Sequence, residues 1–137
     1  MIIDEIVICI SLKVIIIDAT CIIDPNETGE DGVFLSGLPK DTYYQSLKDH
    51  GFSAILTIYH LEVKYPEDLT HKQIVLEDSY DIKINRYFEE AISFIDTHRK
   101  TGNVLVHCYA GMSRSGTIVI AYLMTKNNWS FETAFSY

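Results

Sequence analysis

The sequence predicts an α/β fold in which a central, mostly parallel β-sheet is flanked by helices. Short apolar runs rich in Val and Ile alternate along the chain with segments whose apolar residues recur at helical spacing. Such alternation is typical of parallel sheets, because two parallel strands are joined by a long crossover that is usually a helix. With 137 residues, the chain has the length of one ordinary domain.

The N-terminal part is expected to be an extension of that domain. The β-branched clusters at residues 6–10 and 14–17 predict two short strands. The polar stretch 24–32, which contains one Pro and two Gly, predicts an exposed loop or linker. We therefore expect residues 1–31 to form an extension and residues 32–137 to form the domain. Charged residues interrupt the apolar N-terminus, so no membrane span is expected.

Within the domain, each element is predicted from its apolar pattern and its end signals. Apolar runs predict strands at residues 33–35, 54–59, 74–76 and 104–106. Helical spacing predicts helices at residues 41–50, 88–99 and 115–126, the first of them stopped by Gly51. Ser130 is a suitable N-cap for a last helix, but the sequence stops after about two turns. We therefore expect the chain to be truncated at its C-terminus.

Composition excludes several classes of function. The formal net charge of -8 argues against nucleic acid as a partner. The three cysteines Cys9, Cys21 and Cys108 show no C-x-x-C spacing, so neither a zinc site nor a disulfide framework is predicted. We expect no metal or cofactor, and a cytoplasmic or nuclear location. The sequence does not predict an oligomeric state.

One segment combines the features of an anion-binding site. The strand predicted at 104–106 runs through a short loop into the helix predicted at 115–126, so that loop N–H groups and the positive helix end converge. Cys108 stands at the strand end and Arg114 at the helix start. The guanidinium can bind phosphate oxygens in a bidentate manner, and the same N–H groups favour the thiolate form of the cysteine. The intervening residues are Tyr109, Ala110, Gly111, Met112 and Ser113.

These residues resemble the active-site signature of the cysteine-dependent protein tyrosine phosphatases. His107 and Cys108 are followed by five residues and then by Arg114 and Ser115. The sequence of residues 110–115, Ala-Gly-Met-Ser-Arg-Ser, most resembles the dual-specificity branch. The resemblance extends over residues 33–137. It implies a phosphatase-type fold with a strand, a phosphate loop and a helix at its site. It also implies a phosphoprotein substrate, hydrolysed at phosphotyrosine and at phosphoserine or phosphothreonine.

The resemblance also implies a role for each residue of the site. Cys108 is the expected nucleophile, which forms a phosphocysteine, and Arg114 clamps the phosphate. Residues 109–113 contribute the phosphate-binding loop, His107 orients the thiolate, and Ser115 stabilises the thiolate as it departs. The leaving oxygen needs a proton from a nearby carboxylic acid. Glu77, Asp78 and Asp81 are candidates from the sequence, and Asp78 is the one that the resemblance selects.

Three other functions compete with this interpretation. A phosphopeptide-binding pseudophosphatase is disfavoured because Cys108, Arg114 and a candidate acid are all present. A phosphatase of the same fold acting on an RNA 5′-triphosphate or a phosphoinositide would call for further cationic residues, whereas Arg114 is the only basic residue of the loop. A redox or metal protein would need closer cysteine spacing than this chain has.

Overall fold

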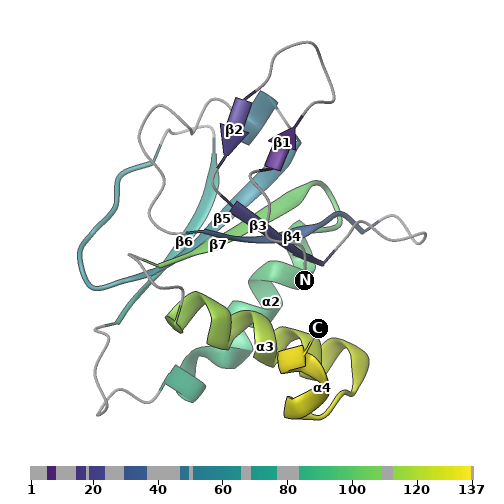
Figure 1. Ribbon diagram of the computed structural model, residues 1–137. Helices are drawn as coiled ribbons and strands as arrows, with labels where there is room; N and C mark the ends of the chain where they lie inside the picture. The colour runs from purple at the N-terminus through teal and green to yellow at the C-terminus, as the bar shows by residue number, and fades with distance from the viewer. Residues whose placement is uncertain are drawn as a thin grey trace.

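The computed structural model contains a five-stranded sheet with helices packed on it (Figure 1). The structure describes residues 6–8, 15–17, 19–23, 30–36, 47–49, 51–65, 69–76, 84–108 and 113–136, with only the backbone described for 6–8, 15–17, 19–21 and 113. Three of the four strand pairs are parallel, and the pair at the N-terminal edge, between residues 19–23 and 33–36, is antiparallel. The predicted, mostly parallel sheet is thus confirmed. The strands, in spatial order, are β3 (Ala19–Ile23), β4 (Val33–Ser36), β7 (Asn103–His107), β5 (Phe52–Tyr59) and β6 (Thr70–Val75).

Strand β3 was not foreseen from the sequence. It pairs with β4 in antiparallel fashion, with Cys21 opposite Phe34, and so adds an outer strand to the central sheet. The strands predicted farther upstream are present as β1 (Ile6–Ile8) and β2 (Ile15–Ile17), which form a two-stranded antiparallel sheet of their own. The expected domain boundary between residues 31 and 32 stays a prediction.

Four of the described helices lie together on one face of the sheet (Figure 1). They are η1 (Ile84–Tyr87), α2 (Phe88–His98), α3 (Ser113–Asn127) and α4 (Phe131–Ser136). Leu56 and Val106 from the central strands pack with Ile95 of α2 and with Ile118 and Tyr122 of α3. None of the described helices is long and apolar enough to cross a membrane.

The opposite face of the sheet has its own apolar cluster. Phe52, Ile55 and Leu105 from the central strands pack there with Leu47. Because β5 and β7 bury both faces, their sequences are nearly continuous apolar runs, as expected for parallel strands in the middle of a sheet. Residues 47–49 are helical, within the helix predicted at 41–50. Gly51 has a φ of 82°, the left-handed conformation expected after a helix end.

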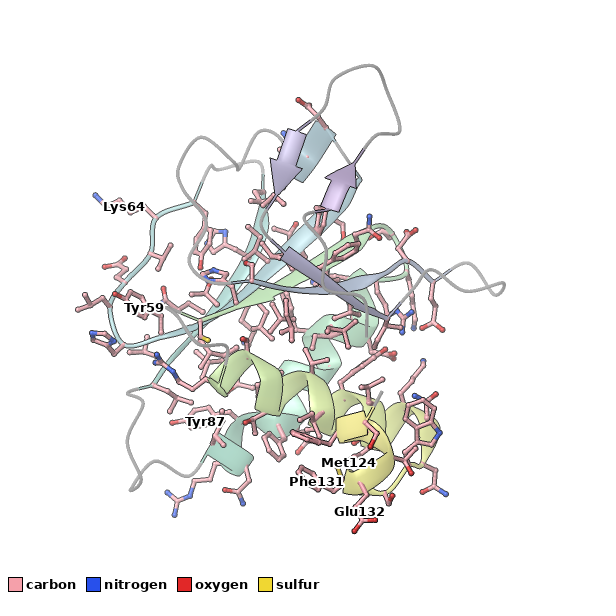
Figure 2. The ribbon with its side chains drawn as sticks, in the orientation of Figure 1. Tyr59, Lys64, Tyr87, Met124, Phe131 and Glu132 are labelled. Atoms are coloured by element: carbon pink, nitrogen blue, oxygen red, sulfur yellow. The ribbon has the colours of Figure 1, made fainter. Side chains whose placement is uncertain are left out.

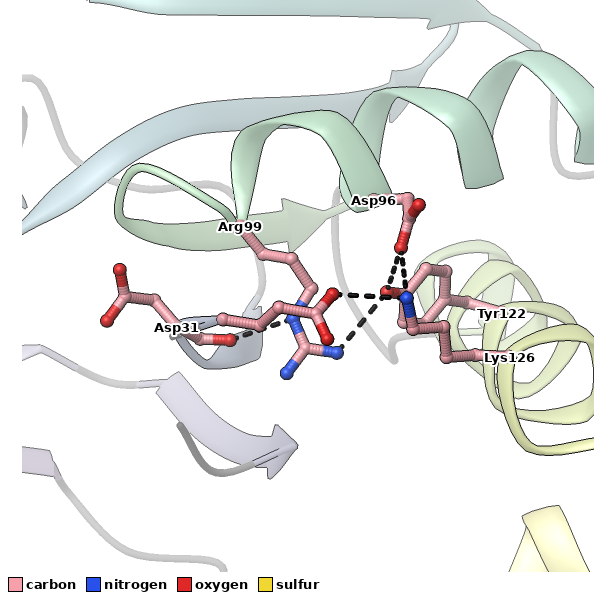
Figure 3. A network of polar contacts seen from close by, with 6 residues as sticks. Asp31, Asp96, Arg99, Tyr122 and Lys126 are labelled. Atoms are coloured by element: carbon pink, nitrogen blue, oxygen red, sulfur yellow. Dashed lines mark hydrogen bonds and ion pairs between the residues drawn. The ribbon is translucent and has the colours of Figure 1, made fainter. Parts of the chain in front are cut away.

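A buried arginine links the helices to the segment that precedes β4 (Figure 3). Arg99 is 2% exposed and donates from Nε to the carbonyl oxygen of Asp31 (2.8 Å) and from Nη1 to the Tyr122 hydroxyl (3.2 Å). Tyr122 in turn donates to Asp96, which also accepts a hydrogen bond from Lys126. The network thereby joins the end of α2 to the middle of α3. It fixes the helix whose first turn contributes to the site described below.

Candidate active site

The site lies where β7 ends and α3 begins. Cys108 directly follows β7 and is fully buried. Its Sγ lies 3.3 Å from Oγ of Ser115, which is also fully buried in the first turn of α3. The N-terminal end of a helix carries partial positive charge, so the end of α3 favours negative charge at this place. The helix begins at Ser113, two residues before the predicted start.

The guanidinium of Arg114 is held by the end of a neighbouring strand. Arg114 is 9% exposed, and its Nη1 donates to the carbonyl oxygen of Leu76 at 2.8 Å. Leu76 follows β6, and its own N–H donates to the carbonyl oxygen of Tyr59 at the end of β5 (3.2 Å). Among the described residues, the buried Nε of Arg114 has no hydrogen-bond partner. Because an unsatisfied buried donor is costly, this guanidinium is well suited to bind an anion.

The imidazole of His107 is held by a hydrogen bond with a threonine of β5. The two residues stand opposite each other in the parallel pair of β5 and β7, and Nε2 of His107 lies 2.7 Å from Oγ1 of Thr57. Thr57 also forms a hydrogen bond with the hydroxyl of Tyr65. Burial lowers the pKa of His107 from 6.5 to about 4, and a contact with the backbone of Cys108 opposes this shift more weakly. His107 is therefore neutral at pH 7 and acts on its neighbours through hydrogen bonds.

Several of the predicted site residues lie outside the part of the chain that the structure describes. These are the three candidate acids Glu77, Asp78 and Asp81, and the loop residues Tyr109, Ala110, Gly111 and Met112. The backbone of Ser113 is described, whereas its side chain is not. The structure thus places Cys108 in contact with Ser115, His107 next to Cys108 at the end of β7, and Arg114 next to Ser115 in the first turn of α3. The catalytic roles of all the site residues stay predictions.

The residues that support this centre were not predicted from the sequence. Thr57, Tyr65 and Leu76 reach it only because β5, β6 and β7 are neighbours in the sheet. Thr57 carries one weak signal, since it is a polar residue between Leu56 and Ile58 in a mostly apolar strand. A buried hydroxyl generally has a hydrogen-bond partner, and His107 and Tyr65 are its partners here.

The register of the strands shows whether Cys21 and Cys108 could form a disulfide, as a redox function would require. Cys21 of β3 is level with Phe34 of β4, which is level with Leu105 of β7. Two strand spacings and three residues therefore separate the backbones of Cys21 and Cys108, roughly 14 Å. A disulfide requires Cα atoms within about 7 Å, so these two cysteines cannot form one in this fold. Within the described ranges, no group of three His, Cys, Asp or Glu residues could hold a metal ion.

A buried cysteine between a central parallel strand and a helix, with an arginine in the first helical turn, is typical of a cysteine-dependent phosphatase. The family model for the dual specificity phosphatase catalytic domain matches residues 33–137, and the chain belongs to this family. The fold and the family expected from the sequence are thereby confirmed.

Curated relatives and solved structures agree with this assignment. The chain is 37% identical over 107 residues to dual specificity protein phosphatase 1 of Arabidopsis thaliana, which covers 77% of the chain and 54% of the relative. It is 43% identical over 89 residues to MAP kinase phosphatase with leucine-rich repeats protein 1 of Dictyostelium discoideum, covering 65% of the chain and 11% of the relative. The chain thus spans about half of the first relative and a small part of the second.

A solved structure has the same arrangement of elements. The crystal structure of DUSP15 superimposes with a TM-score of 0.69 at 30% sequence identity, covering 76% of this chain and 67% of that one. The α/β sheet with flanking helices is therefore the fold of this phosphatase family.

Proposed function

We propose that this domain hydrolyses phosphate monoesters of phosphoproteins, at phosphotyrosine and at phosphoserine or phosphothreonine, with Cys108 as the nucleophile. The observation that carries the proposal is the contact of 3.3 Å between the Cys108 sulfur and the Ser115 hydroxyl at the N-terminal end of α3. A hydroxyl at this distance can donate a hydrogen bond to the thiolate that attacks phosphorus and later departs from it. The anionic form is the nucleophile that this chemistry requires.

The reaction divides into two displacements. In the first, the Cys108 thiolate attacks phosphorus, the bond from phosphorus to the ester oxygen breaks, and Asp78 gives its proton to the leaving oxygen. In the second, Asp78 takes a proton from water, the water oxygen attacks the phosphocysteine, and the bond from sulfur to phosphorus breaks. Inorganic phosphate leaves, and Ser115 donates a hydrogen bond to the regenerated thiolate.

Arg114 is proposed to bind the phosphate through both displacements. Its Nη1 is engaged by the Leu76 carbonyl oxygen, whereas its buried Nε has no partner among the described residues. A phosphate oxygen would satisfy that donor and would be stabilised by the guanidinium charge. The hydrogen bond to Leu76 restricts the orientation of the guanidinium before substrate arrives, which lowers the entropy lost on binding.

Two other activities remain as alternatives to protein dephosphorylation. A pseudophosphatase would bind a phosphopeptide without turnover, and the presence of Cys108, Arg114 and Asp78 together favours turnover instead. A non-protein phosphate ester, such as a phosphoinositide, is the other alternative. The odd number and the scattered spacing of the three cysteines support our proposal of a cytoplasmic or nuclear location.

Hydrolysis of an aryl phosphate by the purified chain in excess chelator tests the activity. We expect metal-independent turnover that disappears in Cys108→Ser and persists in Cys21→Ser, a matched change at a cysteine remote from the site. Phosphate release from phosphotyrosine, phosphothreonine and phosphoinositide substrates then separates the alternatives. Equal turnover by wild type and Cys108→Ser would overturn the proposal, as would binding of phosphopeptides without any release of phosphate.

A further inference from the structure

The side chain of Gln73 in β6 holds the segment that leaves the neighbouring strand β5. Its Nε2 donates to the carbonyl oxygen of Leu61 at 2.6 Å and lies 3.5 Å from that of Tyr59. Its Oε1 accepts a hydrogen bond from the backbone N–H of Val63 at 3.0 Å. A carboxamide is needed for this arrangement, because it presents a donor and an acceptor side by side. One half-buried glutamine thus engages three backbone groups of the segment 59–63.

The same segment leads to a group of polar contacts next to the candidate nucleophile. Two residues beyond Val63, the hydroxyl of Tyr65 forms a hydrogen bond with Oγ1 of Thr57. Thr57 Oγ1 lies 2.7 Å from Nε2 of His107, and His107 directly precedes Cys108. A continuous series of contacts therefore runs from Gln73 through the segment to the residue beside the cysteine.

A second contact from β6 supports the end of the segment. The ring of Tyr65 stacks on that of His71, with ring centroids 4.3 Å apart and the planes inclined by 20°. His71 stands two positions before Gln73, so both side chains leave the strand on the same face. The segment is held at its start by Gln73 and at its end by His71. Between them, Lys64 extends away from the molecule, on the side remote from Phe131 of α4 (Figure 2).

We propose that Gln73 is a positioning residue for phosphoryl transfer, which keeps Tyr65 on Thr57 and thereby fixes His107 beside the nucleophile. The proposal rests on the proposed function at Cys108. Gln73 itself contacts neither the sulfur nor Arg114 in the described contacts, and it acts through the backbone of residues 61–63. Without it, the start of the segment loses its hydrogen bonds to β6, and Tyr65 is held there by the stacking on His71 alone, so its hydroxyl is positioned less firmly on Thr57.

Replacing Gln73 by Met tests this role, because Met has a similar length and cannot form either kind of hydrogen bond. We expect kcat for an aryl phosphate to fall about fivefold to tenfold, the effect of losing one or two net hydrogen bonds, with KM changed less than about twofold. Lys72→Met is the matched control. Lys72 neighbours Gln73 in β6 and forms a partly exposed ion pair with Glu90 at 3.1 Å, so its loss should leave kcat unchanged.

A double-mutant cycle with Tyr65→Phe separates positioning from general stabilisation. If Gln73 acts through the Tyr65 hydroxyl, Gln73→Met should change kcat by less than about twofold once that hydroxyl is absent. Fully additive losses would overturn the proposal, as would wild-type kcat in Gln73→Met. Should the Met variant fail to fold, Gln73→Asn, which keeps the polarity and shortens the reach, carries the same prediction.

The positioning role of Gln73 can also be tested by a measurement that does not depend on turnover. The imidazole resonances of His107 should shift in Gln73→Met in the same direction as in Tyr65→Phe, and unchanged resonances would contradict the proposal. Absence of any Cys108-dependent turnover in the wild type would refute the proposed function. Turnover that depends on Cys108 but not on Gln73, with unchanged His107 resonances, would refute the positioning role alone.

Discussion

The sulfur of Cys108 and the hydroxyl of Ser115 lie 3.3 Å apart in the protein interior, and both side chains are fully buried. The strand β7 delivers the cysteine, and the first turn of α3 delivers the serine. A hydroxyl that donates to sulfur stabilises the thiolate more than the thiol, because hydrogen bonds to charged groups are the stronger ones. The contact therefore bears on the step in which the thiolate departs from phosphorus.

Ser115→Ala should slow the breakdown of the phosphocysteine about tenfold, which corresponds to the loss of one charge-assisted hydrogen bond. Formation of the intermediate should change less, so a burst of aryl alcohol should precede a slow steady state in rapid-mixing experiments. Ser93→Ala, at an exposed position of α2, serves as the control and should behave as the wild type. A loss of burst amplitude together with slow steady-state turnover would contradict this role.

Thr57→Val should lower kcat about tenfold with little change in KM, because the isosteric valine removes the hydrogen bonds to His107 and Tyr65 together. The fold should persist, since a β-branched side chain of the same shape suits a strand. Steady-state kinetics beside thermal unfolding checks both statements. Thr70→Val, at an exposed position of β6, is the matched control, and equal kcat in the two variants would refute the role of Thr57.

Most elements of the fold could be predicted from the sequence, because β5, β7 and α3 carry long apolar patterns and clear ends. Strand β3 could not, since the short run Ala-Thr-Cys-Ile-Ile has no clear alternation of polar and apolar residues, and only its pairing with β4 identifies it as a strand. The first four residues of β6, Thr70 to Gln73, are polar and at least partly exposed because β6 lies at the edge of the sheet. Its pattern therefore predicted a strand only at residues 74–76.

The candidate site also contains residues that the sequence predicts and residues that it does not. Cys108 and Arg114 are close in sequence, so their spacing alone predicted a shared anion site. Thr57 and Gln73 contribute through the order of the strands, and no local pattern in the sequence encodes that order. The hydrogen bond from Arg114 to the Leu76 carbonyl oxygen was equally unpredictable, because any residue supplies a carbonyl group.

Acid should destabilise the domain through His107. Its pKa is lowered from 6.5 to about 4 by burial, so between these pH values the unfolded chain binds a proton that the folded chain does not. The free energy of unfolding contributed by this group therefore falls as pH drops through that window, by about 2 kcal/mol between pH 7 and pH 5.

Urea unfolding at the two pH values measures this loss. His107→Gln places an amide near the position of Nε2 and cannot be protonated, so its pH dependence should be smaller by about the same amount. An identical pH dependence in wild type and variant would show that other groups are responsible.

The assignment of the acid can be tested with leaving groups of different basicity. A poor leaving group needs a proton from the acid much more than a good one does. Asp78→Asn should therefore reduce hydrolysis of alkyl phosphates more than that of activated aryl phosphates. Asp81→Asn is the matched comparison three residues away. If Asp81→Asn shows the selective loss and Asp78→Asn does not, Asp81 is the acid.

Capture of the covalent intermediate shows directly whether Cys108 is the nucleophile. Wild-type protein mixed with an aryl phosphate and quenched rapidly under mild conditions should carry one phosphoryl group, and peptide mass spectrometry should place it on Cys108. The yield should rise in Ser115→Ala, in which breakdown is slowed. Turnover without a detectable phosphocysteine in either protein, or a phosphoryl group on another residue, would contradict nucleophilic catalysis by Cys108.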